Sequence, residues 1–126
     1  MPPNFVFGWI WTFVGLIAGT ALGMRFHRED WLGGYASHPR RMIRLGHVSF
    51  LGLGFINILF AIAAPAVVLF RGAMSVASGA LILGAVTMPI GCGLMAWRRG
   101  LQPIFAVPVL SLLLGVGLAV AGMLWP

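Results

Sequence analysis

Four long apolar segments occupy most of this chain of 126 residues, and nearly all of its charged residues lie between them. None of the four segments contains an Asp, Glu, Lys or Arg. An α-helix of about 20 apolar residues is long enough to cross the hydrocarbon core of a bilayer, and each segment reaches that length. The pattern therefore predicts an all-α integral membrane protein with four transmembrane helices, at residues 5–24, 45–70, 73–97 and 104–125.

The composition supports this fold class. Hydrophobic residues make up 60% of the chain and charged residues only 8%, which is typical of a membrane protein. A soluble protein of this length has too little interior to bury four such segments. The connections are short, so we expect one domain, residues 1–126, whose four helices form a compact bundle.

Arginine is concentrated in the first and third connections, and Arg71 is the only basic residue of the second. Basic residues in short loops favour the cytoplasm, so residues 25–44 and 98–103 are predicted to be cytoplasmic and both termini to lie on the other side. Every basic residue is Arg and none is Lys, which favours a bacterial inner membrane as the location. The arginines expected to contact lipid or a partner protein are Arg25, Arg28, Arg40, Arg41, Arg44, Arg98 and Arg99.

Small residues mark one face of the first segment. Gly15, Gly19 and Gly23 are spaced by four and Gly8 lies seven residues earlier, so all four share a helical face. Helices in lipid associate through close backbone contact, which glycine permits. This face either packs on another helix of the chain or docks on a partner subunit. Asn57, the only amide inside the four segments, is expected near mid-membrane, bonded to another helix or to a backbone carbonyl.

Turn and cap residues predict the helix boundaries. The pair Gly33-Gly34 predicts a turn, and Ser37 predicts the start of a helix that continues over residues 39–70. Only Arg71 and Gly72 would then connect the second and third transmembrane helices. Each of the last three segments carries a proline that is expected to kink its helix, namely Pro65, Pro89 and Pro108.

The candidate binding residues surround the first connection. Arg40, Arg44 and His47 are spaced at i, i+4 and i+7, so they share one face of a helix. His27 follows the first segment, which runs the opposite way, so the two histidines are expected at comparable depth on adjacent helices. Such a pair could ligate a b-type haem, with Arg40 and Arg44 pairing its propionates, and Met24 is an alternative axial ligand. The same face could instead bind a quinone or a lipid headgroup.

Several classes of function lack the residues they need. No carboxylate lies in any predicted span, which argues against a proton-coupled transporter. No nucleophile–base or phosphate-binding motif is present. A zinc site needs three or four ligands, and the single thiol, Cys92, lies far from the histidines. No basic face outside the membrane is available for nucleic acid.

These observations favour a non-catalytic subunit or accessory protein of a larger membrane complex. It would contact membrane lipids and other subunits through glycine-rich helix faces, without a resident cofactor. The alternative is a small electron-transfer membrane protein that binds haem b or quinone through His27, His47 and the nearby arginines.

Overall fold

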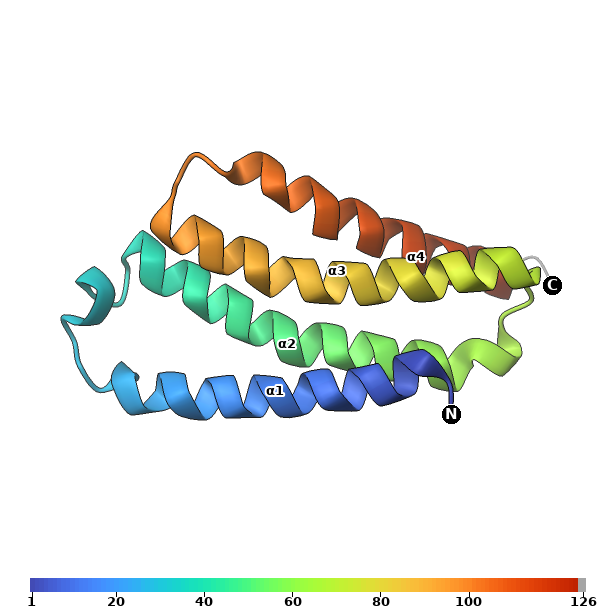
Figure 1. The fold of residues 1–126 in the computed structure, drawn as a ribbon, viewed down its shortest axis with the longest axis horizontal. Helices are drawn as coiled ribbons and strands as arrows, with labels where there is room; N and C mark the ends of the chain where they lie inside the picture. Colours follow the sequence, from blue (N-terminus) through green and yellow to red (C-terminus); the bar gives the residue numbers. More distant parts are fainter. Residues whose placement is uncertain (125–126) are drawn as a thin grey trace.

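The computed structural model describes residues 1–124, and four long antiparallel helices account for most of them (Figure 1). All four, counted with the 3₁₀ turns that flank two of them, are long and apolar enough to cross a membrane, which confirms the prediction of four helices of membrane-spanning length. Residues 1–124 contain no strand. The long helices are α1 (Pro3–Phe26), α2 (His38–Ala63), α3 (Arg71–Trp97) and α4 (Ala106–Leu124). The short 3₁₀ helices are η1 (Trp31–Gly33), η2 (Ala64–Ala66) and η3 (Gln102–Phe105).

The four-helix bundle is an open one, in which the helices follow one another in chain order. Each long helix packs mainly against its neighbours in the sequence, so that α1 contacts α2, α2 contacts α3, and α3 contacts α4. Contacts between α1 and α3 are few. The start of α1, the end of α4 and the α2–α3 connection lie at one end of the bundle, and the other two connections lie at the opposite end (Figure 1). We refer to the latter as the arginine end.

The glycine face of α1 packs on α2 of the same chain. A methyl group added at Gly8 would lie only 2.6 Å from the carbonyl oxygen of Gly54, so the two backbones approach more closely than larger residues would allow. Gly15 and Gly19 likewise lie against side chains of α2. Gly23 has nothing within 4 Å. Three of the four glycines are therefore used inside the chain, and only Gly23 remains open to another molecule.

The second helix is shorter than predicted. The sequence indicated one helix over residues 39–70, but α2 ends at Ala63, and Pro65 lies in the 3₁₀ turn that follows. Proline cannot donate to the helical hydrogen-bond ladder, and here it ends the helix instead of kinking it. The chain is not helical again until Arg71, which begins α3. The expected two-residue connection between the second and third helices is therefore wrong.

The other two prolines occupy different positions in their helices. Pro89 lies inside α3, as the sequence predicted. Pro108 is the third residue of α4, in the first turn, where a backbone N–H has no helical partner to lose. Pro108 therefore belongs to the start of α4 and does not interrupt it.

The predicted boundaries around η1 are confirmed. Ser37 is the N-cap of α2, and its side-chain oxygen accepts a hydrogen bond from the backbone N–H of Arg40. Gly33 and Gly34 have φ angles of 82° and 92°, which glycine adopts with little strain. The chain thus reverses direction just before α2 begins.

Candidate functional site

Arg40 is the most deeply buried charged residue of the arginine end, with 3% of its surface exposed. Its guanidinium donates hydrogen bonds to three carbonyl oxygens where α1 ends, those of Phe26 (2.9 Å), Arg28 (3.3 Å) and Glu29 (3.2 Å). It also lies 4.8 Å from the centre of the Phe26 ring. Arg40 therefore joins the first turn of α2 to the last turn of α1.

This arrangement has a clear physical basis. The last carbonyl groups of a helix have no intrahelical partner and carry the negative end of the helix dipole. A buried guanidinium is costly unless its donors are bonded, and here carbonyl oxygens accept from both terminal nitrogens and an aromatic face lies beside the group, while Nε has no partner among residues 1–124. The structure thus gives Arg40 a capping role in place of the cofactor pairing that its spacing suggested.

His38 makes a similar contact on the other side of α2. Its Nε2 atom lies 2.8 Å from the carbonyl oxygen of Met95, in the last turn of α3. A carbonyl can only accept, so Nε2 carries the proton and donates. The first turn of α2 therefore caps both α1 and α3. His38 was not among the predicted site residues, although its place beside the Ser37 cap was a usable signal.

Arg44 points outward and is fixed by a tyrosine. Its guanidinium lies 4.0 Å from the centre of the Tyr35 ring and donates to the Tyr35 carbonyl oxygen at 3.2 Å. The other predicted lipid-contacting arginines are exposed, in contrast to Arg40. They are Arg25, Arg28, Arg41, Arg98 and Arg99.

The structure does not bring His27 and His47 together. The His47 ring packs against Gly19, in the body of α1, whereas His27 is the exposed C-cap residue of the same helix. Eight residues separate Gly19 from His27, which is about 12 Å along the axis of α1. The prediction that the two histidines lie at comparable depth is therefore wrong. Because both imidazoles must reach one iron atom, these residues do not fit a bis-histidine haem.

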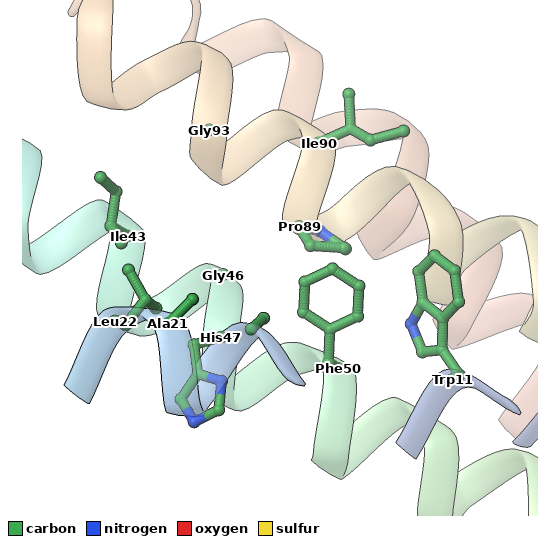
Figure 2. A pocket seen from close by; sticks show the side chains of 11 residues that line it. Trp11, Ala21, Leu22, Ile43, Gly46, His47, Phe50, Pro89, Ile90 and Gly93 are labelled. Carbon is green, nitrogen blue, oxygen red and sulfur yellow. The ribbon is translucent and has the colours of Figure 1, made fainter. Parts of the chain in front are cut away.

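A cavity of about 430 Å³ lies between α1 and α3, with α2 beneath it (Figure 2). Its walls are almost entirely apolar and include Trp11, Leu22, Phe50 and Pro89, with His47 at the edge. The Trp11 and Phe50 ring centres are 4.9 Å apart. Two buried nitrogen atoms of the lining, Nε1 of Trp11 and Nδ1 of His47, have no hydrogen-bond partner among residues 1–124.

The opposite end of the bundle contains a buried polar network. Asn57 is fully buried; its carbonyl oxygen accepts from the Asn4 amide at 2.8 Å, and its own amide donates to the Leu53 carbonyl at 2.8 Å. The Ser78 hydroxyl donates to the Asn4 side chain. This network connects α1, α2 and α3. Because Asn4 is the second residue of α1, Asn57 lies closer to the end of the bundle than the expected mid-membrane position.

No protein-family model matches this chain, and neither a curated protein nor a solved structure shows detectable similarity to it. Within residues 1–124, no three or more His, Cys, Asp or Glu side chains are grouped so that they could hold a metal ion. The candidate binding features are therefore the apolar cavity and the exposed arginines.

The capping role of Arg40 predicts that Arg40→Gln lowers the free energy of unfolding by about 3 kcal/mol, because three bonds from a charged donor are lost. Arg40→Lys should also destabilise, since one ammonium group cannot replace the planar fork. Arg41→Gln removes the same charge from the adjacent, exposed position and should change stability little. Unfolding by dodecyl sulfate in mixed micelles measures the free energy of unfolding of the three variants. Equal stability of Arg40→Gln and Arg41→Gln would contradict the assignment.

Proposed function

We propose that this protein is a non-catalytic subunit or accessory protein of a larger membrane complex. The observation that carries the proposal is that its buried polar side chains make hydrogen bonds within the chain. Arg40 and His38 cap neighbouring helices, and Asn4, Asn57 and Ser78 bond to one another or to the backbone. Their hydrogen bonds hold the helices together and leave little capacity for contact with a substrate. Such a protein acts through its shape and its surface.

The open arrangement of the helices supports a partner on the side of α4. A groove of about 320 Å³ lies between α2 and α4, and Phe60, Leu81 and Ala119 form part of its lining. Gly117 is not part of that lining but follows Val116, which is, and nothing lies within 4 Å of the position that its Cβ would take. Small residues on an exposed helix face allow another helix to approach closely, which a lipid chain does not require. A transmembrane helix of a partner subunit fits this surface.

We further propose that the chain lies in a bacterial inner membrane with the arginine end in the cytoplasm and both termini on the other side. Seven arginines lie in the connections at the arginine end or in the helix turns beside them, whereas Arg71 lies at the opposite end beside the α2–α3 connection. Arginines clustered in short segments favour the cytoplasmic side, so the seven arginines of the arginine end support a cytoplasmic location for that end.

A second candidate function is supported by the cavity between α1 and α3. Its volume of about 430 Å³ falls within the range of small-molecule sites. A planar ligand with carbonyl oxygens, such as a quinone headgroup, would supply the acceptor that the Trp11 N–H lacks. The Phe50 ring lies against Trp11 and would have to turn to admit it. The proposal concerns quinone binding only, because the histidines do not fit a haem.

The proposed orientation predicts which cysteine variants react with a membrane-impermeant maleimide. In a Cys92→Ala background, Ala66→Cys should be labelled in intact spheroplasts, because η2 lies at the outer end. Glu29→Cys should be labelled only after lysis. Both positions are exposed, so reactivity reports sidedness and not burial. The reverse pattern would overturn the orientation.

The proposed partner surface predicts a position-dependent crosslink in the native host. A photoreactive residue at Val120, beside the groove, should give one adduct with a distinct membrane protein. The same residue at Leu16, an exposed position on α1, should react with lipid only. Gly117→Leu should reduce the Val120 adduct about tenfold, which corresponds to 1.4 kcal/mol of binding free energy. A stable monomer with its own turnover would refute the proposal, as would adducts with lipid alone.

The quinone candidate predicts that Trp11→Phe and His47→Ala each weaken binding of a short-chain quinone about tenfold, the effect of one lost hydrogen bond. Trp9→Phe is the matched control, because Trp9 is exposed and does not line the cavity. Titration of ¹⁵N-labelled indole signals measures the affinity. If Trp9→Phe and Trp11→Phe behave alike, the cavity is not the binding site.

A further inference from the structure

The first turns of α2 present an exposed face that combines charge with apolar surface. Arg41, Arg44, Leu45 and Val48 lie at i, i+3, i+4 and i+7, and they line a surface groove of about 370 Å³ together with Met42. We call these five residues the α2 groove. None of the five is buried, unlike Arg40, and the groove shares no residue with the cavity lined by Trp11.

The polar half of the α2 groove contains two guanidinium groups. Arg44 is held by the Tyr35 ring at 4.0 Å and by the Tyr35 carbonyl, which accepts from one of its N–H groups. A guanidinium has five N–H donors, so the bond to the Tyr35 carbonyl uses only a small part of the donor capacity of Arg44. Arg41 is exposed one turn earlier on the same face. Two planar cations so placed suit the oxygen atoms of a phosphodiester.

The apolar half follows directly along the helix axis. Leu45 is 48% exposed and Val48 is 59% exposed, and the apolar segment of α2 begins at Leu45. The two arginines are therefore at the level where lipid headgroups meet the hydrocarbon, with an aliphatic strip immediately below them. A soluble anion would use only the arginines. A phospholipid would use both halves.

We propose that the α2 groove binds one anionic phospholipid, with its phosphate bridged by Arg41 and Arg44 and an acyl chain lying along Leu45 and Val48. The net charge of the chain is +6, and seven of its eight arginines lie at this end, so a lipid of net negative charge is favoured over a zwitterionic one. The inference does not depend on the partner surface of α4 or on the quinone cavity.

The test compares two double variants that lose the same charge at the same end of the bundle. Native mass spectrometry would measure binding of phosphatidylglycerol to the full chain in detergent, with phosphatidylcholine as the comparison lipid. We expect Arg41→Gln/Arg44→Gln to weaken phosphatidylglycerol binding at least tenfold and Arg98→Gln/Arg99→Gln to weaken it less than twofold. Val48→Ser should weaken it several-fold without a change of charge.

Other outcomes would overturn the proposal. Equal losses in the two double variants would indicate a diffuse charge effect, and competition by inorganic phosphate with no effect of Val48→Ser would indicate a soluble-anion site. If Arg41→Gln/Arg44→Gln does not fold, Arg41→Lys/Arg44→Lys keeps the charge and decides the question. This variant should lower the affinity for phosphatidylglycerol several-fold, because lysine lacks the planar guanidinium that binds a phosphodiester through two hydrogen bonds. Unchanged affinity in the lysine variant would reject the bridged phosphate.

Discussion

Because α1 packs on little besides α2, its place in the bundle is set by the polar contacts at its two ends. At the arginine end, the Arg40 guanidinium donates to the carbonyl of Phe26, the last residue of α1, and to two carbonyls of the connection that follows. At the other end, Asn4 bonds to Asn57. Between them, Gly8 and Gly54 bring the two backbones together. Lipid provides no hydrophobic drive for helix association, so these polar bonds and close contacts decide the position of α1.

The same contact organises the first connection. The chain from His27 to Ser37 passes around the Arg40 side chain, which lies near the rings of Phe26, Trp31 and Tyr35. The Tyr35 ring in turn stacks on the Arg44 guanidinium, and the Tyr35 carbonyl oxygen accepts a hydrogen bond from Arg44. The buried Arg40 thereby helps to set the direction of the half-buried Arg44. The conformation of the first connection and the placement of Arg44 on α2 therefore both depend on the buried Arg40 side chain.

Much of the fold could be predicted from the sequence, because span length and the Ser37 cap depend on local chemistry. The end of α2 could not, since Pro65 permits either a kink or a stop, and the choice depends on contacts such as the hydrogen bond from the Val68 N–H to the Gly122 carbonyl. That bond joins the α2–α3 connection to α4, which is 54 residues further along the chain. Local patterns carry no information about such a partner.

The candidate site shows the same division. Arg40 and His47 were correctly placed on one helical face, but spacing alone does not reveal what covers that face. In the structure it is covered by α1, whose Gly19 leaves room for the imidazole. The position of the His47 ring along α1 is set by Gly19, which was predicted only to be a packing residue. A glycine opposite a large polar side chain was the signal that was missed.

The four helices also differ in the interactions that fix them in the bundle, and this difference determines which helix a partner could shift. Polar bonds join α1, α2 and α3, whereas α4 rests on an apolar cluster of Phe60, Ala77, Leu81 and Ala119 and on close contacts of Gly84 and Gly115. Apolar packing in lipid can exchange one helix for another at little cost, and the hydrogen bond from the Val68 N–H to the Gly122 carbonyl is the polar contact that a shift of α4 would have to break. Moving α1 would break the hydrogen bonds of Arg40 at one end of the helix and the bond between Asn4 and Asn57 at the other. A partner at the α2–α4 groove would therefore contact the helix that is easiest to shift, and α1 to α3 would keep their arrangement.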